Sequence, residues 1–268
     1  MSYKVRYPSA ALSPYIKQYW AMEGTVPADT GHIQRIVPSG FADLIFYFGD
    51  LPVNISRADS PSARSVLNGQ QSDFYDLKVT GKLDMLSVTF TPQGSGLFFN
   101  LPPDEFFNRN LPLKDIAGPT ANRLEELLFD AHSIESRIFI IEKFFTRMLG
   151  YRKHYGFRRI ADSISMINLA RGITNVDDLA SRACLSRRQF ERTFTVSVGI
   201  GPKQFLRVVR FQNAISLRQK NPSATLTEIA YQSGFSDQSH MVREFRTISG
   251  HTPGSYFSEC EPVSDYFS

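Results

Sequence analysis

The sequence predicts an α+β protein with two domains. The first is an N-terminal antiparallel β-barrel with trailing helices, and the second is an all-α domain with two helix-turn-helix motifs joined by a long helix. Short apolar runs separated by turn residues, typical of antiparallel strands, occupy residues 32–90. Helical periodicity begins after Thr91-Pro92. The final observation is a repeat, in which VDDLASRACLSRRQFERTF at Val176–Phe194 matches LTEIAYQSGFSDQSHMVREF at Leu226–Phe245.

The β-rich part is expected to form a domain over residues 1–150. Asp84–Phe90 alternates cleanly, with Leu86, Val88 and Phe90 on one side. Asn54–Ala63 is rich in Ser, Pro and charged residues, which predicts a long exposed loop. The remaining predicted strands are His32–Val37, Phe41–Phe48, Val66–Gln70 and Phe74–Val79.

Two amphipathic helices are expected next. Residues 120–131 place leucines on one face, and Ser133–Leu149 carries an apolar stripe at i, i+4, i+7 spacing. Phe139 and Phe144 lie off that stripe, so the second helix is apolar nearly all round. Such a helix is either buried centrally or shared with a partner chain, and a homodimer through Ser133–Leu149 is therefore one of two readings. Residues 151–157 are expected to form the linker between the two domains.

Each helix of the second domain has a predicted boundary. Pro202 suits a first helical position and starts a helix that runs to about Lys220. Side chains that can cap a helix N-terminus precede the shorter helices, and two of them form the S/T-x-x-E/Q capping box. The predicted cap pairs are Asn175 with Asp178, Ser186 with Gln189, and Thr225 with Glu228. The second helix of the second motif is expected to begin at Ser236.

Net positive charge is concentrated in the half of the chain that holds the repeat. Residues 1–150 carry 14 Lys and Arg against 16 Asp and Glu, whereas residues 151–258 carry 16 against 7. The acidic tail, residues 259–268, adds three acids. A basic domain that coincides with paired helix-turn-helix patterns indicates a double-stranded DNA partner.

Helical geometry at about 100° per residue separates inward from outward side chains in each second helix. Phe190, Phe194, Met241 and Phe245 are expected to be core. Outward arginine can pair with guanine and glutamine with adenine, whereas other basic residues would contact phosphates. The base-contact candidates are Arg188, Glu191, Arg192, Gln238, Ser239 and Arg243. The phosphate candidates are Lys203, Arg207, Arg210 and Arg246. For any one arginine, a solvated surface role is the competing interpretation.

These residues carry a family resemblance. Residues 158–258 resemble the DNA-binding domain of the AraC/XylS family of bacterial transcription regulators, most clearly over Leu226–Phe257 and in A-x5-S-R-R-Q-F-E-R-x-F from Ala180. The turns differ, with Cys184 where the second motif has Gly234. The resemblance implies that two recognition helices enter successive major-groove segments on one face of DNA. It also implies transcription regulation, frequently activation through contact with RNA polymerase.

The N-terminal half resembles companion domains of that family more loosely, through Pro38-Ser39-Gly40 and Phe90–Gly94. This resemblance implies binding of a small-molecule effector or dimerisation. A barrel interior with aromatic and a few polar side chains could hold a small molecule, although aromatic residues in strands are usually core. The effector-pocket candidates are Trp20, Arg35, Asp43 and Tyr47.

Composition excludes several other classes. No apolar run is long enough for a bilayer, and the start MSYKVRYPSA lacks the apolar core of a signal peptide. Cys184 and Cys260 make neither a disulfide framework nor a metal pattern, so a cytoplasmic location is expected. The five histidines show no ligand spacing, so we expect no metal, no cofactor and no enzyme activity. The alternatives for the N-terminal domain are a cupin-like metal-dependent enzyme and a purely structural dimerisation module.

Overall fold

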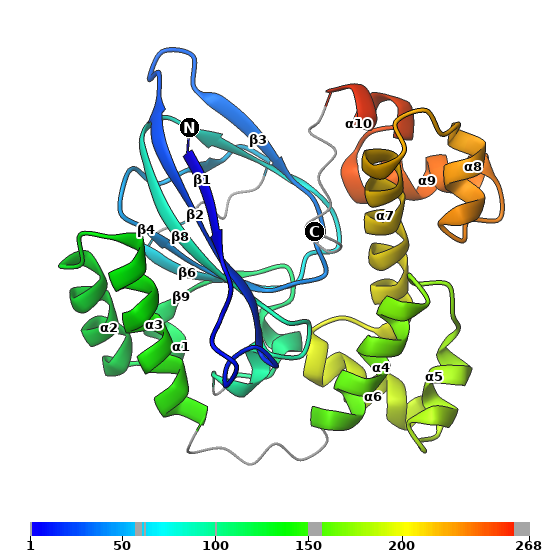
Figure 1. Ribbon diagram of the computed structural model, residues 1–268, viewed down its shortest axis with the longest axis horizontal. Coiled ribbons are helices and arrows are strands. Elements are labelled where there is room, and N and C mark those ends of the chain that lie inside the picture. Colours follow the sequence, from blue (N-terminus) through cyan, green and yellow to red (C-terminus); the bar gives the residue numbers. More distant parts are fainter. Residues whose placement is uncertain (1, 57–60, 62, 100, 150–156, 260–268) are drawn as a thin grey trace. The chain divides into compact units, whose positions relative to one another are not determined.

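The computed structural model describes the chain except residues 1, 57–60, 62, 100, 150–156 and 260–268. The chain divides into two compact units (Figure 1). The first comprises Met1–Ile36, Phe41–Gly69 and Tyr75–Tyr155, and the second comprises Val37–Gly40, Gln70–Phe74 and Gly156–Ser268. The predicted linker lies outside the described residues except for Phe157, and the predicted acidic tail except for Glu259.

The first unit contains two antiparallel sheets. One has six strands in the order β1-β2-β8-β4-β6-β9, and the other has three in the order β3-β7-β5. Their bounds are β1 Ser2–Arg6, β2 Ile16–Val26, β3 His32–Ile36, β4 Asp43–Tyr47, β5 Val53–Asn54, β6 Ser65–Asn68, β7 Tyr75–Val79, β8 Gly81–Phe90 and β9 Asn110–Pro112. The predicted antiparallel class is confirmed, but the pairings among the described strands form two separate sheets and not one closed barrel.

Helices follow the strands, as the sequence predicts. α2 runs over Pro119–Phe129 and α3 over Ile134–Leu149, preceded by the short α1 at Leu113–Ala117. Two 3-10 turns, η1 at Ser95–Leu97 and η2 at Pro103–Phe106, connect β8 to β9.

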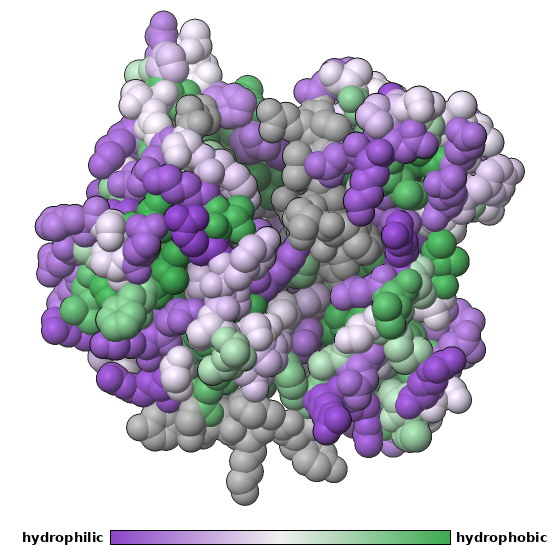
Figure 2. Space-filling model, in the orientation of Figure 1, coloured by the Kyte–Doolittle hydropathy of each residue, from purple (hydrophilic) through white to green (hydrophobic). Residues whose placement is uncertain are grey.

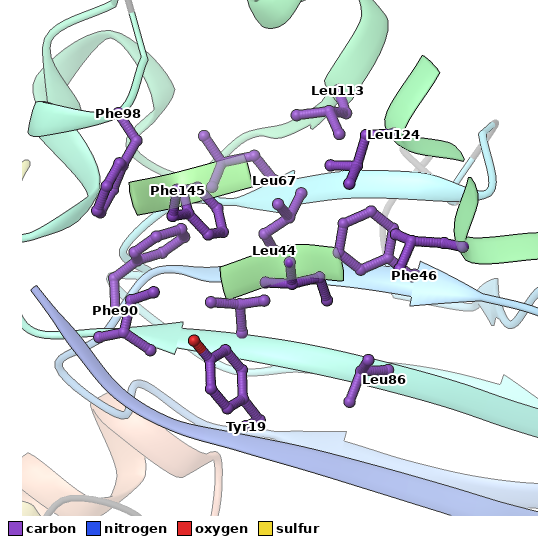
Figure 3. Packing of buried hydrophobic residues seen from close by; sticks show 14 of the residues in the cluster. Tyr19, Leu44, Phe46, Leu67, Leu86, Phe90, Phe98, Leu113, Leu124 and Phe145 are labelled. Carbon is purple, nitrogen blue, oxygen red and sulfur yellow. The ribbon is translucent and has the colours of Figure 1, made fainter. Parts of the chain in front are cut away.

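These helices cover one face of the six-stranded sheet. Tyr19, Leu44 and Phe46 point from that face into a core that also takes Leu124 and Phe145 from the helices (Figure 3). Phe90, Phe98 and Phe145 form the aromatic centre, with the Phe98 and Phe145 ring centroids 4.5 Å apart. Strand alternation places the odd-numbered residues of β4 on the opposite face, where Ile45 and Tyr47 are buried together with Val66.

The second unit contains the predicted all-α domain. Two helix-turn-helix motifs, α5–α6 and α8–α9, lie on either side of the long helix α7, as predicted (Figure 1). The bounds are α4 Phe157–Leu169, α5 Val176–Arg182, α6 Arg187–Val198, α7 Pro202–Lys220, α8 Leu226–Gln232, α9 Gln238–Ser249 and α10 Pro253–Glu259. Pro202 occupies the first helical position of α7, and the helix ends at Lys220, both as predicted.

Candidate nucleic-acid interface

The first predicted recognition helix is α6, and a reciprocal cap fixes its start. The backbone N–H of Gln189 donates to Ser186 Oγ at 3.4 Å, and the backbone N–H of Ser186 donates to Gln189 Oε1 at 3.1 Å. This is the capping box that the sequence predicts. The helix ends at Gly199, whose φ of 96° is the left-handed cap that favours glycine.

The inner face of α6 is aromatic and its outer face is basic. Phe190 and Phe194 are fully buried with ring centroids 5.6 Å apart, and Phe205 of α7 packs 5.5 Å from Phe194. Arg188 and Arg192, both predicted base contacts, are exposed on the opposite side. Within the described residues no ion pair engages either guanidinium, so both are available to a ligand.

Arg187 is a basic residue of α6 that the sequence reasoning missed. Its guanidinium pairs with Asp177 of α5 at 3.0 Å and with Glu191 one turn further along α6 at 3.1 Å. Hydrogen bonding to Glu191, followed by the charge of Asp177, raises the Arg187 pKa. The carboxylate of Glu191, a predicted base contact, is therefore already held by Arg187 in the protein alone. Only its i, i+4 spacing from Glu191 could have indicated this.

Side chains also cap both helices of the second motif. Thr225 and Glu228 form the predicted capping box at the start of α8. The N-cap of α9 is Asp237, whose Oδ1 accepts from the backbone N–H of His240 at 2.7 Å. The prediction that this helix opens on Ser236 is wrong by one residue. Ser236 instead donates its backbone N–H to Nδ1 of His240 at 3.3 Å.

The outer face of α9 carries the predicted base contacts. Gln238, Ser239 and Arg243 are exposed, while Met241 and Phe245 are fully buried. Within the protein, Gln238 Oε1 accepts a hydrogen bond from the Thr227 hydroxyl at 3.0 Å. The side-chain amide of Gln238 keeps its donors for an adenine or a phosphate.

The phosphate candidates divide into two groups. Lys203 and Arg246 are exposed. Arg207 donates from Nε to Oε2 of Glu244 at 2.7 Å, with 34% of its side chain exposed. Arg210 is partly buried, and burial lowers its pKa, with Glu244 opposing that shift. Lys203 and Arg246 are thus open to solvent, whereas Arg207 and Arg210 already have a structural role.

The two turns differ in residue type but share a backbone conformation. Cys184 has a φ of 53° and Gly234 a φ of 78°, so both lie in the left-handed region. A non-glycine residue there is uncommon and carries strain. Cys184 is a free, exposed thiol at this strained position.

The effector-pocket candidates lie in the first unit, and three of them share one face. Trp20 and Ile45 both pair with Ser87, which puts their side chains on the same side of the six-stranded sheet. Strand alternation adds Asp43 and Tyr47 to that side. Trp20, Asp43 and Tyr47 therefore share the face opposite the helices.

Polar contacts already exist on that face. Asp43 Oδ1 accepts from the Thr89 hydroxyl at 2.6 Å and from the Ser87 hydroxyl at 3.2 Å. Burial is the main cause of the raised pKa of Tyr47, with the nearby Tyr75 and Asp43 adding to it. Arg35, the remaining candidate, lies in the other sheet, where Nε and Nη2 donate to the two carboxylate oxygens of Asp76 at 2.8 Å each.

The described residues lack two kinds of feature. They contain no group of three His, Cys, Asp or Glu side chains placed to hold a metal ion. In the same part of the chain, no helix is both long and apolar enough to cross a membrane.

Two family models match the chain. A helix-turn-helix domain family matches residues 179–259, which include the whole second motif and all of the first except the first three residues of α5. A domain family of unknown function, DUF6597, matches residues 4–112.

Curated relatives match the chain over about a third of its length. The HTH-type transcriptional regulator MtrA of Neisseria gonorrhoeae is 33% identical over 85 residues, which cover 32% of this chain and 28% of MtrA. A protein of Streptomyces lividans named as an AraC-like transcription regulator is 34% identical over 82 residues, covering 30% of this chain and 26% of the relative. The aligned region thus spans about a quarter of the length of these relatives.

Solved structures match the chain at low similarity. ToxT from Vibrio cholerae covers 96% of this chain and 97% of its own length at 14% identity, with a TM-score of 0.47. The DNA-binding domain of AdpA, crystallised with a target DNA, covers 37% of this chain and 90% of its own length at 27% identity, with a TM-score of 0.35.

Proposed function

We infer from its C-terminal AraC-type helix-turn-helix domain that this protein is a DNA-binding regulator of transcription, and we propose that it reads two successive major-groove segments with α6 and α9. One observation carries the proposal: two capped recognition helices stand in one compact unit, each with an exposed polar face. Arg188 and Arg192 form that face in α6, and Gln238, Ser239 and Arg243 form it in α9.

The two faces differ, and this favours an asymmetric site. Arginine at the start of a recognition helix pairs with guanine O6 and N7, and glutamine with adenine. At the 51-residue step of the repeat, Ser239 of α9 stands where α6 has Arg188, and Val242 stands where α6 has Glu191. Arg243 matches Arg192, but the other two positions differ, so one chain would read unlike sequences in the two segments. A palindrome read by one chain would need two matching faces.

Phosphate contacts would supply the sequence-independent part of the affinity. Lys203 and Arg246 are exposed and basic, and residues 151–258 carry 16 basic against 7 acidic residues. Such contacts release counterions, so binding should weaken steeply with salt.

Selection of bound fragments from a random DNA library tests the proposal. The expected product is a bipartite motif whose halves lie about one helical turn, roughly 10 base pairs, apart on one face of the duplex. The Lys203→Ala variant should select the same motif with lower affinity. A pool that shows no enriched sequence, even at low salt, would refute sequence-specific binding.

We further propose that the protein acts in the cytoplasm as an activator that contacts RNA polymerase. The exposed recognition surface and the AraC-type domain support a regulator, and the direction of regulation needs a functional test. The selected site is placed upstream of a weak promoter that drives a reporter gene. Transcription should rise when the protein is supplied, and a fall would make the protein a repressor at that promoter.

Small-molecule sensing is the role we propose for the first unit. Trp20, Asp43 and Tyr47 share one sheet face, which combines aromatic surface with a carboxylate that already accepts two hydroxyl hydrogen bonds. A metabolite panel is screened for changes in both melting temperature and DNA affinity. A bound effector should change both values in the wild type and neither in an Asp43→Asn variant. If no compound in the panel changes either value, sensing of those compounds is excluded.

A homodimer through α3 is the second role proposed for this unit. Phe139 is 59% exposed near the middle of α3, and Leu127 of the neighbouring α2 is 39% exposed. Figure 2 shows hydrophobic residues at the surface over these helices, next to hydrophilic ones. Sedimentation should report a dimer for the wild type and a monomer for Phe139→Glu. An unchanged mass in that variant would place any dimer contact elsewhere.

A further inference from the structure

The loop that leads into the first helix-turn-helix motif and the turn of the second motif both lie next to Arg210 of α7, the helix that joins the motifs. The loop that follows α4 crosses α7 at Gly172, which is buried and has a φ of 77°. A Cβ at Gly172 would lie 2.9 Å from Cγ of Arg210 and 3.1 Å from the backbone nitrogen of Arg210. Only a residue without a side chain lets this loop, which leads into the first motif, rest directly on α7.

The turn of the second motif reaches the same place. A Cβ at Gly234 would lie 2.7 Å from Cγ1 of Ile173 and 3.4 Å from Cδ of Arg210. Ile173 belongs to the loop that enters the first motif, and Gly234 to the turn between α8 and α9. The loop that leads into the first motif therefore lies against the turn of the second motif, and the aliphatic stem of Arg210 lies next to both.

The burial of Arg210 shows that its stem fills a packed position. Nε of Arg210 is buried and has no hydrogen-bond partner among the described residues. A buried donor without a partner is unfavourable, so a basic residue at this position needs another reason. Arginine can cover apolar surface with its methylene groups, and here those groups lie next to both glycine-containing segments.

A second contact limits the movement of α9 on α7. Arg207, one turn before Arg210, pairs with Glu244 of α9 at 2.7 Å, and only 16% of the Glu244 side chain is exposed. The ion pair thus holds α9 on α7 one turn before Arg210, the residue on which the loop leading into the first motif rests.

We propose that Gly172, Ile173, Arg210 and Gly234 form a junction that fixes the separation of α6 and α9, and thereby the spacing of the two DNA segments that the protein accepts. The inference rests on the proposed reading of two major-groove segments. One base pair moves a segment by about 3.4 Å and turns it by about 35°, because roughly 10 base pairs make one helical turn. A rigid junction cannot move α6 and α9 to match a segment displaced in this way, whereas a loosened junction can.

The stem and the charge of Arg210 can be separated by substitution. Arg210→Met keeps an unbranched stem and removes the guanidinium, whereas Arg210→Ala removes both. If Arg210 acts as a spacer, the methionine variant retains the wild-type spacing preference and the alanine variant loses it. If Arg210 acts only through a phosphate, both variants lose affinity equally at every spacing, and both show a smaller salt dependence.

The experiment uses the full chain and a bipartite site selected with the wild type. Affinity is measured on that site and on versions with one base pair added or removed between its halves. The wild type should lose about tenfold or more with either change, since one helix then loses its base contacts. Arg210→Ala should reduce that penalty several-fold, and Arg210→Met should not. Lys203→Ala, an exposed substitution on the same helix, should lower affinity equally at all spacings.

The wild-type and variant measurements test the two-segment reading and the junction separately. A wild type that selects no site, or a site with a single half, refutes the two-segment reading and the junction with it. A wild type that selects a bipartite site, together with an Arg210→Ala variant that keeps the full spacing penalty, overturns the junction alone. If Arg210→Ala fails to fold by melting temperature, Ile173→Ala takes its place, because Ile173 is 50% exposed and its loss leaves α7 intact. The same reduced penalty is expected for Ile173→Ala, and an unchanged penalty overturns the proposal.

Discussion

Arg207 Nε lies 2.7 Å from Glu244 Oε2, in an ion pair that joins the long helix α7 to α9, the predicted second recognition helix. The two residues are 37 positions apart in the sequence. The Glu244 carboxylate is mostly buried, so solvent screens this pair less than a surface pair. A phosphate contact by Arg207 stays a prediction, and Arg207 would have to make it while Glu244 holds its Nε.

Removing Glu244 should therefore destabilise the helical unit. Glu244→Ala leaves the partly buried guanidinium of Arg207 without its acceptor, which we expect to lower the free energy of unfolding by about 1–3 kcal/mol. Chemical denaturation followed by helical circular dichroism measures this. Glu191→Ala is the matched control, because it breaks an exposed i, i+4 pair with Arg187 and should cost only about 0.3–0.5 kcal/mol. Equal losses in the two variants would show that the Arg207 pair is no stronger than a surface pair.

Arg243 is the strongest base-contact candidate in α9. It is exposed on the recognition face, and no ion pair within the described residues holds it. Arg243→Ala should weaken binding to the selected site by about 1–3 kcal/mol and relax the preference at one base position. Arg246→Ala, three residues along the same helix, should weaken binding to all sequences alike. Affinities on a set of single-base variants of the site decide between the two. A uniform loss for Arg243→Ala would make Arg243 a phosphate contact.

Local patterns in the sequence predicted the helical unit well. Caps depend on side chains within three or four residues of the helix start, and the pairs at Ser186 and Thr225 form as predicted. The N-cap of α9 was predicted one residue too early, because Ser236 and Asp237 are adjacent and both residue types favour the N-cap position. With Asp237 as the cap, the repeat keeps a step of 51 residues from one N-cap to the other, and Ser236 is the additional residue before the second helix.

Contacts between distant segments could not be predicted from such patterns. β1 and β2 were missed, since β1 is a short, mostly exposed edge strand, and β2 mixes polar and aromatic residues over Ile16–Val26. The bidentate pairing of Arg35 with Asp76 depends on strand register, which the sequence alone does not give. The contact of Gly172 and Gly234 with Arg210 likewise depends on three segments meeting in the folded chain.

The cap of α9 makes the stability of the helical unit depend on pH. The hydrogen bond from the His240 backbone N–H, with smaller contributions from the Ser236 hydroxyl and the charge of Arg243, holds the pKa of Asp237 below its usual range. This stabilisation is fully present above the ordinary aspartate pKa of about 4 and is lost as pH falls through the lowered value.

Asp237→Asn tests this dependence, because asparagine caps helices well but does not titrate. The melting temperature of the wild type should fall between about pH 5 and pH 3 more steeply than that of the variant, and the two should be close at pH 7. Some acid sensitivity should remain in the variant, since hydrogen bonds from Thr225 also lower the pKa of Glu228. Parallel curves for the two proteins would exclude Asp237 as the source.

Cys184 and Gly234 hold equivalent positions in the two motifs, and their left-handed backbone predicts opposite effects of substitution. Cys184→Gly removes the Cβ from a residue with a φ of 53°, so relief of roughly 1–2 kcal/mol of strain should exceed the greater chain entropy of glycine, about 0.5–1 kcal/mol. The expected gain in unfolding free energy is about 0.5–1 kcal/mol.

Gly234→Ala has the opposite effect, because it adds a Cβ at a φ of 78° and 2.7 Å from Ile173 Cγ1. The unfolding free energy of this variant should fall by more than about 1 kcal/mol. Both changes are measured by denaturation under reducing conditions, with Cys184→Ala as a control that removes the thiol and keeps the strain. A loss of stability in Cys184→Gly would mean that the Cys184 side chain contributes packing that outweighs its backbone strain.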